Sequence, residues 1–210
     1  MGDWHFIAVE GVIGVGKTTL ATLLSKRLNG KLVLEEVNDN PFLPMFYDSP
    51  ERYSFVTQIF FLLSRYNTLR ELTTRDIFSK VIVSDYMFEK DKIFASINLN
   101  DRERLLYENI YSLLKKDIPS PDIIIYLQAD TSILLERIKS RGRPYENGIT
   151  PEYLNAINDA YNEFFFHYEE APILIINSNN ISFTKQPEAL EILLQQLDRL
   201  KKGLNFFSMA

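Results

Sequence analysis

The sequence contains no cysteine, and this absence excludes several kinds of chemistry. Disulfide bonds, thiol nucleophiles and thiolate zinc sites all require cysteine. Histidine is nearly absent too, because only His5 and His167 occur and they lie far apart in the sequence. Isolated histidines are more often surface or packing residues than functional groups, so we expect neither to be catalytic.

The sequence also lacks long apolar runs and clusters of positive charge. No stretch approaches the about 18 apolar residues of a membrane span. The first predicted strand begins almost at once, so we expect no signal peptide. The net charge is -5 at pH 7, without a basic tail or a run of Lys and Arg. These absences predict a cytoplasmic protein that binds neither membranes nor nucleic acid.

The apolar residues that are present predict one domain, residues 1–210. The chain is 46% hydrophobic and 24% charged, which suits a compact domain with a full core. Short continuous apolar runs predict buried parallel strands at residues 6–9, 32–34, 81–83, 123–127 and 173–176. Helices are predicted at residues 18–28, 51–75, 101–116, 130–140, 151–168 and 187–202. The alternation predicts an α/β fold with a five-stranded parallel sheet between helical layers.

Residues 11–18, Gly-Val-Ile-Gly-Val-Gly-Lys-Thr, carry the most specific motif in the chain. They fit the phosphate-binding P-loop pattern G-x-x-x-x-G-K-[ST], and they stand between a predicted strand and a predicted helix, as the motif requires. Backbone N–H groups of such a loop surround a phosphate, while the lysine reaches the β- and γ-phosphates and the hydroxyl ligates Mg²⁺. The nucleoside triphosphate is predicted to be bound by Gly11, Val12, Ile13, Gly14, Val15, Gly16, Lys17, Thr18 and Thr19.

Carboxylates follow two of the predicted strands. Asp85 comes at the end of the strand at 81–83, and Glu35 and Glu36 follow the strand at 32–34. Beside a P-loop, one such acid holds Mg²⁺ and another acts as a base toward the phosphoryl acceptor. We assign the metal role to Asp85 together with Thr18, and the base to Glu35 or Glu36. The alternative is that these acids are solvated or cap the next helix.

Three arginines, Arg137, Arg141 and Arg143, lie where the fourth predicted helix ends. Arginines on a mobile segment can close over a transferring phosphoryl group, neutralise its developing charge and exclude water. We therefore predict a lid at about residues 137–149. The alternative is a solvated basic helix end that complements its own dipole.

The segment from residue 35 to 64 holds seven aromatic residues but only one basic residue, Arg52. An acceptor that already carried a phosphate would require arginines here. The composition instead predicts a pocket for a neutral, flat, hydroxylated molecule. Tyr47 and Gln58 are its most informative polar residues. The alternative is that most of these aromatic side chains belong to the core.

Together these residues resemble those of bacterial deoxynucleoside kinases, of the deoxyadenosine/deoxyguanosine kinase group. The resemblance covers about residues 5–178 and rests on residues 10–19, 35–37, 40–43, 46–47, Gln58, Arg65-Tyr66 and 137–146. It implies a P-loop NTPase-type three-layer fold, a homodimer, and transfer of a phosphoryl group from ATP with Mg²⁺. The implied acceptor is the 5′-hydroxyl of a deoxynucleoside, with deoxyadenosine or deoxyguanosine favoured and deoxycytidine as a further candidate.

The resemblance also implies roles for individual residues. Glu35 matches the glutamate that takes the 5′-hydroxyl proton, and Lys17, Arg137, Arg141 and Arg143 match groups around the donor phosphates. The residues implied to bind the deoxynucleoside are Glu35, Tyr47, Gln58, Arg65, Asp85, Asp91, Phe94 and Glu146. Within this set, Gln58 pairs with the base edge, Arg65 lies at the far end of the base pocket, and Phe94 stacks on the base. Tyr47 and Glu146 hold the sugar 3′-hydroxyl, and residues 177–181 lie near the donor adenine.

The chain departs from the family pattern in three places. Glu36 stands where proline often follows the catalytic glutamate, so either acid remains a candidate base. Asp85-Tyr86-Met87 replaces a common Asp/Glu-Arg-Ser, so the arginine that would contact the phosphate and the base is missing. The helix predicted over residues 85–94 is one residue shorter than in animal enzymes. The aspartate that pairs with the base is therefore either Asp91 or lost, with Lys90 in its place.

Two other functions remain as alternatives. A nucleoside monophosphate kinase of the thymidylate type would share the P-loop, but it would require more basic residues between 35 and 64. A regulatory GTP-binding switch would require Asp-x-x-Gly and Asn-Lys-x-Asp, and neither string occurs in the sequence.

Overall fold

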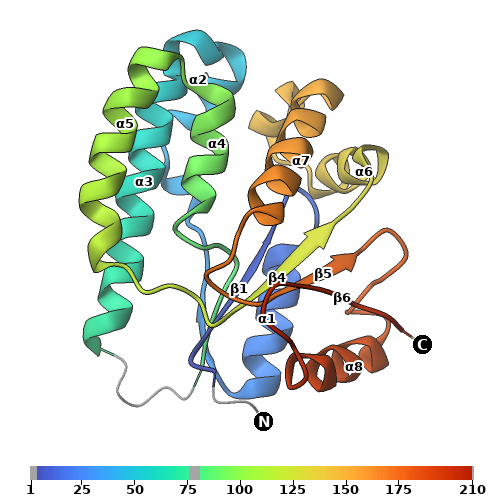
Figure 1. Ribbon diagram of the computed structural model, residues 1–210. Helices are drawn as coiled ribbons and strands as arrows, with labels where there is room; N and C mark the ends of the chain where they lie inside the picture. The colour runs from blue at the N-terminus through green and yellow to red at the C-terminus, as the bar shows by residue number, and fades with distance from the viewer. Residues whose placement is uncertain (1–3, 76–80, 210) are drawn as a thin grey trace.

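The computed structural model describes residues 4–75 and 81–209, with one parallel sheet at its centre (Figure 1). Residues 1–3, 76–80 and 210 of the predicted domain lie outside the described residues. Five strands pair in parallel in the order β2-β3-β1-β4-β5, and β6 extends the sheet beside β5. The strands are β1 (Phe6–Gly11), β2 (Lys31–Val33), β3 (Ile82–Ser84), β4 (Ile123–Gln128), β5 (Ile173–Asn177) and β6 (Leu204–Phe206).

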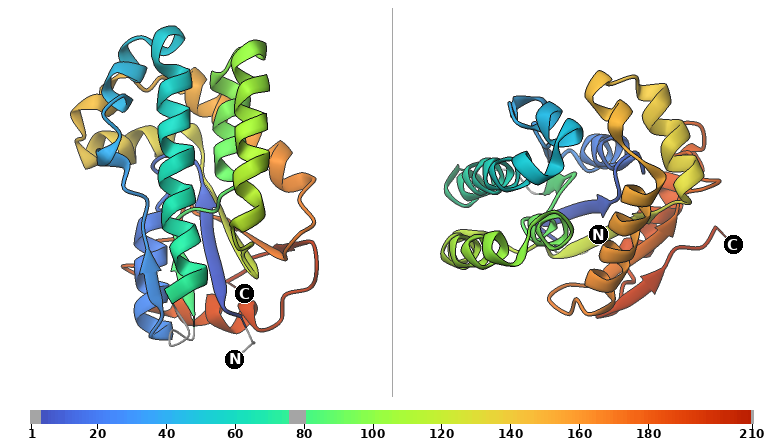
Figure 2. Two further views of the ribbon diagram at one scale, coloured as in Figure 1. Left: turned by 90° about the vertical axis from the view of Figure 1, so that its left-hand side faces the viewer. Right: turned by 90° about the horizontal axis from the view of Figure 1, so that it is seen from above.

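Helices cover both faces of this sheet (Figures 1 and 2). The α-helices are α1 (Lys17–Leu28), α2 (Leu43–Asp48), α3 (Pro50–Arg75), α4 (Lys90–Asn98), α5 (Asp101–Leu114), α6 (Thr131–Arg141), α7 (Pro151–Phe166) and α8 (Pro187–Leu197). Helix α1 packs on β1, β2 and β3 and lies beside α8, to which an ion pair between Arg27 and Glu191 joins it. On the opposite face α7 packs on β4, where Tyr161 stacks on Tyr126 (Figure 2).

The central strands form because their side chains are apolar on both sides. Ile7, Ala8 and Val9 of β1 are fully buried, as are Ile124 and Ile125 of β4. Such continuous apolar runs are stable only where helices cover both faces of the sheet. The predicted α/β sandwich and its five strands are therefore confirmed.

The structure corrects the sheet by adding a sixth strand, β6. Leu204 and Phe206 remain largely exposed, and the strand pairs only with β5 at the edge of the sheet. A strand of three residues with exposed side chains leaves no burial pattern in the sequence, which explains why periodicity did not predict it.

Several helix boundaries also differ from the prediction. Helix α4 begins at Lys90 rather than at residue 85, since residues 85–89 form a connection without helical structure. Helix α5 ends at Leu114 and continues as the 3-10 helix η2 (Lys115–Asp117). At the start of α6, Asp130 makes no side-chain hydrogen bond to the helix. At the start of α7, the Thr150 hydroxyl accepts a hydrogen bond from the Tyr153 N–H and caps the helix.

The carboxyl ends of the strands meet at one edge of the sheet (Figure 1). Helices α2 to α5 stand beyond this edge on one side, and α6 and α7 stand on the other. Open parallel sheets bind their ligands at this edge, so it is where the site must be sought. Within the described residues, no helix is both long and apolar enough to cross a membrane.

Candidate active site

The P-loop connects β1 to α1 and depends on glycine at two positions. Gly11 has φ of +143°, and a Cβ there would lie 2.4 Å from the Leu127 carbonyl oxygen of β4. Gly16 has φ of +109° and immediately precedes α1. Glycine adopts both conformations without steric cost, so the loop passes close to β4 and then enters the helix. Lys17 Nζ donates to the carbonyls of Gly11 at 2.8 Å and Val12 at 3.0 Å, which places the ammonium over the loop.

A hydroxyl and a carboxylate lie together beside the loop. Thr18 Oγ1 donates to Asp85 Oδ2 at 2.5 Å, and Asp85 Oδ1 accepts from the Glu35 backbone N–H at 2.8 Å. These hard oxygen ligands fit Mg²⁺, which typically takes one or two protein oxygens and fills its other positions with phosphate and water. Within residues 4–75 and 81–209, no group of three or more His, Cys, Asp or Glu side chains is arranged to hold a metal ion by itself.

An acceptor cavity of about 270 Å³ lies between α2, α3, α4 and the lid. Its lining includes Lys17 and Thr18 at the P-loop and side chains of α3 and α4. The predicted site residues that line this cavity are Ile13, Gly14, Lys17, Thr18, Glu35, Tyr47, Gln58, Arg65, Asp85, Phe94, Arg141, Arg143 and Glu146. The cavity therefore brings together residues from six segments that are far apart in sequence.

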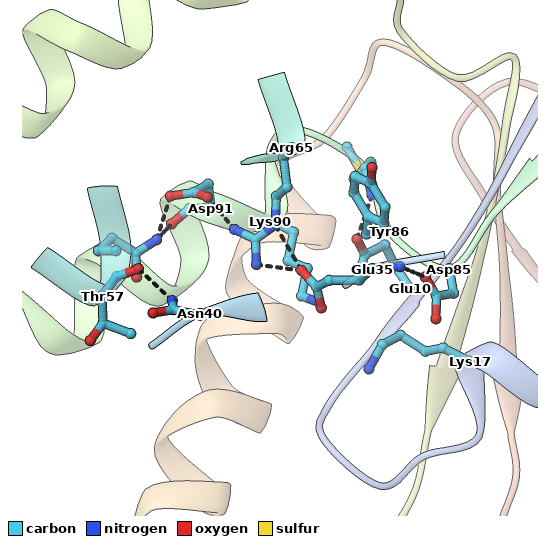
Figure 3. A network of polar contacts seen from close by, with 12 residues as sticks. Glu10, Lys17, Glu35, Asn40, Thr57, Arg65, Asp85, Tyr86, Lys90 and Asp91 are labelled. Carbon is cyan, nitrogen blue, oxygen red and sulfur yellow. Dashed lines mark hydrogen bonds and ion pairs between the residues drawn. The ribbon is translucent and has the colours of Figure 1, made fainter. Parts of the chain in front are cut away.

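Glu35 lines the acceptor cavity and is held by two cations (Figure 3). Its Oε1 accepts from Arg65 Nε at 2.8 Å and from a second guanidinium nitrogen at 2.6 Å, and its Oε2 accepts from Lys90 Nζ at 2.5 Å. Burial alone would raise the pKa of this carboxyl, but Lys90 and Arg65 outweigh burial and hold it well below its usual value. Glu35 is therefore ionised, and its oxygens can accept a hydrogen bond from a ligand in the cavity. Glu36 is exposed and does not line the cavity.

Gln58, which lines the acceptor cavity, forms a buried pair with Asp91 behind it. The Gln58 amide nitrogen donates to the backbone carbonyl of Asp91 at 2.9 Å and to its carboxylate. Because both partners are acceptors, the amide NH₂ must face Asp91. Gln58 lines the cavity, so its carbonyl oxygen is the amide atom left to bind a ligand. Beside it, the buried Thr57 hydroxyl has no hydrogen-bond partner within the described part of the chain.

The structure places Asp91 and Lys90 differently, although the sequence left them as alternatives. Asp91 is fully buried behind the cavity, where it also pairs with Arg65, and burial raises the pKa of its carboxyl. Lys90 lines the cavity itself. Asp91 therefore does not line the cavity, but it contacts two residues that do, Gln58 and Arg65.

At the lid side, Tyr47 stacks on Tyr145 with ring centroids 6.3 Å apart, and both line the acceptor cavity. Tyr145 belongs to the 3-10 helix η3 (Pro144–Gly148), which follows α6. Glu146 on the same turn is buried and accepts from Arg141 at 2.6 and 3.1 Å, while Arg143 lies 3.6 Å away. Two of the predicted lid arginines therefore form ion pairs with Glu146, which lines the acceptor cavity.

A second cavity of about 460 Å³ lies on the other side of the P-loop and is predicted to take the donor. Arg137 lines it and donates to the Val15 carbonyl at 3.1 Å and to the Ser178 carbonyl at 2.7 Å. This arginine joins the P-loop to the segment after β5, where residues 178 and 181 line the donor cavity. Arg141 and Arg143 line both cavities, so these two arginines of the predicted lid lie between them.

Two titratable groups at the P-loop have shifted pKa values. The pKa of Lys17 falls to about 8 because the ammonium is buried and because Lys90 repels it. Glu10 of β1 is fully buried, and burial raises the pKa of its carboxyl. Its oxygens accept from the Met87 N–H at 2.7 Å and the Tyr161 hydroxyl at 3.1 Å. Glu10 thus joins β1 to the connection after β3 and to α7.

The aromatic residues between 35 and 64 divide between cavity and core. Phe46, Tyr47 and Phe61 line the acceptor cavity, whereas Phe42 packs edge-on against Phe60 away from it. The sequence did not single out several other lining residues, namely Thr57, Asn98, Tyr145 and Tyr153. Tyr145 lies within the predicted lid, and Thr57 is next to Gln58. In the sequence, only this position beside predicted site residues pointed to a role in the cavity.

Comparison with known proteins identifies the family. The deoxynucleoside kinase family model matches residues 7–201. Deoxyguanosine kinase of Bacillus subtilis is 42% identical over 174 residues, covering 81% of this chain and 83% of its own. Deoxyadenosine/deoxycytidine kinase of the same organism is 30% identical over 198 residues, with 91% and 90% covered.

A solved structure shows the same architecture. Deoxyadenosine kinase from M. mycoides with bound dCMP and dCDP superposes with a TM-score of 0.80 at 27% identity, covering 92% of this chain and 99% of the other. This fold, with the P-loop beside the acceptor cavity, agrees with the family match. The chain belongs to the deoxynucleoside kinase family and is a phosphotransferase that acts on deoxynucleosides.

Proposed function

We propose that the chain transfers the γ-phosphoryl group of ATP to the 5′-hydroxyl of a purine deoxynucleoside. The observation that carries this proposal is the position of Glu35, which is ionised and lines the same cavity as the P-loop lysine. The names of the relatives support the acceptor class, since they act on deoxyguanosine, deoxyadenosine and deoxycytidine. Deoxyguanosine is the first acceptor to test, because the relative at 42% identity carries that name.

In the proposed reaction, Glu35 orients the 5′-hydroxyl and accepts its proton as the oxygen attacks the γ-phosphorus. The P-loop amides and Lys17 hold the donor phosphates, and Arg137, Arg141 and Arg143 neutralise the charge that develops during transfer. Thr18 and Asp85 would hold Mg²⁺, which when bound neutralises charge on the donor phosphates.

The polar groups of the acceptor cavity match a nucleoside. The Gln58 carbonyl accepts from a donor on the base edge, which both adenine and guanine provide, and the free Thr57 hydroxyl can bind a second base atom. Phe94 lines the same cavity and is proposed to stack on the base. Tyr47 and Glu146 line the side nearest the lid, where they are proposed to hold the 3′-hydroxyl.

We also propose that the whole chain acts as one kinase domain, as a cytoplasmic homodimer. Within α3, the apolar Leu62 is fully buried and Phe61 lines the acceptor cavity, so neither is available for contact with a second copy. An exposed apolar surface of α5, formed by Leu105, Leu106 and Leu113, is a better candidate for contact with a second copy.

The test is ADP release with ATP and Mg²⁺ against dA, dG, dC, dT, their ribonucleosides and dTMP. We expect turnover on dG or dA and little on dTMP. Turnover on dTMP alone would contradict the proposal and favour a nucleoside monophosphate kinase. ADP release that does not depend on any acceptor would contradict it as well, because it would indicate hydrolysis.

A further inference from the structure

The hydrogen bonds of Glu35 leave one position for a ligand. A carboxylate has about four acceptor positions, two on each oxygen. Arg65 occupies two of them on Oε1, and Lys90 occupies one on Oε2. The free position is therefore on Oε2, the oxygen that Lys90 already contacts at 2.5 Å. A 5′-hydroxyl bound there must lie beside the Lys90 ammonium.

Lys90 is built into this position. It is the first residue of α4, its side chain is only 5% exposed, and its ammonium lies 5.8 Å from the centre of the Phe94 ring. An ammonium group has three N–H donors. Glu35 is the one hydrogen-bond acceptor that Lys90 Nζ has among the described residues, so two donors remain for a ligand in the cavity.

The surroundings of Lys90 concentrate positive charge where a phosphate would sit. Lys17 reaches the same cavity from the P-loop (Figure 3). An anion bound in this cavity is attracted by both ammonium groups. The end of β3 supplies no further cation, since Tyr86 is buried there and Asp85 is acidic. Arg65 is occupied by Glu35 and Asp91.

We propose that Lys90 is a catalytic residue that binds the transferred phosphoryl group from the acceptor side, opposite Lys17. This role rests on the proposed function. The 5′ oxygen forms a bond to the γ-phosphorus as the bond to the β,γ-bridging oxygen breaks. The 5′ proton passes to Glu35 Oε2, and the electron pair of the broken bond leaves on ADP. Lys90 donates to a non-bridging oxygen of the moving group throughout, so it also binds the phosphate of the product.

The proposal predicts that Lys90 distinguishes the product from the acceptor. The probes are deoxyguanosine and dGMP, titrated calorimetrically into the full chain. Lys90→Met should weaken dGMP binding by about 10–100-fold, the size expected for a lost hydrogen bond to a charged group. Deoxyguanosine binding should change by less than about threefold, and kcat should fall about 10²–10³-fold. Lys90→Arg keeps the charge and should restore part of the dGMP affinity.

Lys92→Met is the matched control, because Lys92 lies on the same helix but is exposed; it should leave both affinities unchanged. If Lys90→Met does not fold, Lys90→Gln retains a donor to Glu35 and should show the same selective loss. Equal weakening of deoxyguanosine and dGMP, or no weakening of dGMP, would overturn the role of Lys90 alone. Failure of the unmodified protein to bind either compound would overturn the proposed function together with this role.

Discussion

The acceptor and donor cavities lie on either side of the P-loop, yet they are built in different ways. The donor side is built around one contiguous stretch, residues 14–20, with side chains of α6 and of the segment after β5 around it. Backbone amides of such a loop bind phosphate. The acceptor side is formed by side chains from α2, α3, α4 and the lid. Its charged groups are tied to one another, as in the pairs that Glu35 makes with Arg65 and Lys90.

This difference determines what each side can recognise. Backbone amides bind a phosphate chain, which every nucleoside triphosphate carries. A network of side chains with fixed hydrogen bonds binds one arrangement of donors and acceptors, and it disfavours ligands that leave a buried group unpaired. We therefore expect substitutions on the acceptor side to change selectivity, and substitutions on the donor side to change nucleotide affinity.

The largest effect is expected at Glu35, on the acceptor side. Glu35→Gln should lower kcat about 10²–10⁴-fold, because the amide cannot accept the proton. Steady-state ADP release at saturating ATP and deoxynucleoside measures this loss. Glu36→Gln is the control and should be nearly normal, since Glu36 is exposed. A normal rate for Glu35→Gln with a slow Glu36→Gln would transfer the role of base to Glu36.

Arg137 tests the donor side. Arg137→Gln removes the contacts to the Val15 and Ser178 carbonyls that hold the P-loop against the segment after β5. The KM for ATP should rise about 10–100-fold, the range for lost hydrogen bonds from a charged group, while the KM for the deoxynucleoside stays within about threefold. Arg104→Gln on the exposed face of α5 is the control. An equal rise in both KM values would contradict the separation of the two sides.

Gln58 tests the acceptor side in the same way. Gln58→Met removes the carbonyl that faces the cavity and leaves Asp91 without one of its partners. We expect kcat/KM for the preferred purine deoxynucleoside to fall about 10–100-fold, with an unchanged KM for ATP. Gln195→Met on the exposed face of α8 should have no effect. If the Gln58→Met variant kept the same selectivity among nucleobases, residues other than Gln58 would recognise the nucleobase.

The ion pair between Arg141 and Glu146 tests whether the two sides communicate. Arg141 lines both cavities, and its partner Glu146 is buried on the acceptor side. In a double-mutant cycle of Arg141→Gln and Glu146→Gln, the effects on kcat/KM should be non-additive by about threefold to tenfold. The cycle with Arg143→Gln, whose contact with Glu146 is longer at 3.6 Å, is the comparison and should be closer to additive. Full additivity in both cycles would mean that the lid and the acceptor site act independently.

The smallest effect on activity is expected on the exposed apolar face of α5, which belongs to neither cavity. Leu113→Glu should convert the proposed dimer to a monomer, because it places a charge at the centre of an apolar contact. Light scattering with size exclusion measures the mass, which should fall to the 24.5 kDa of one chain. The kcat should stay within about twofold of normal, as expected for a surface change far from the site. Leu204→Glu at the sheet edge is the control. A wild-type mass of one chain would contradict the proposed dimer.

The motifs that lie together in sequence were predictable. The P-loop requires Gly11, Gly16 and Lys17 at fixed spacing, and continuous apolar runs indicate the buried strands. The fold and the donor side could therefore be predicted from local patterns. The strand ends also placed Glu35 and Asp85 at one edge of the sheet. The exposed strand β6 escaped prediction because three residues at an edge leave no periodic signal.

Only the tertiary structure decided which charged side chains pair with one another on the acceptor side. The sequence left Lys90 and Asp91 as alternatives, because neighbouring residues at the start of a helix point in different directions and a shift of one residue exchanges them. Packing of α4 against α3 turns Lys90 toward Glu35 and buries Asp91 behind Gln58. Sequence patterns determined which phosphate-binding loop and which sheet this protein has. The choice of partner for each buried charge depends on distances between separate helices, which no local pattern contains.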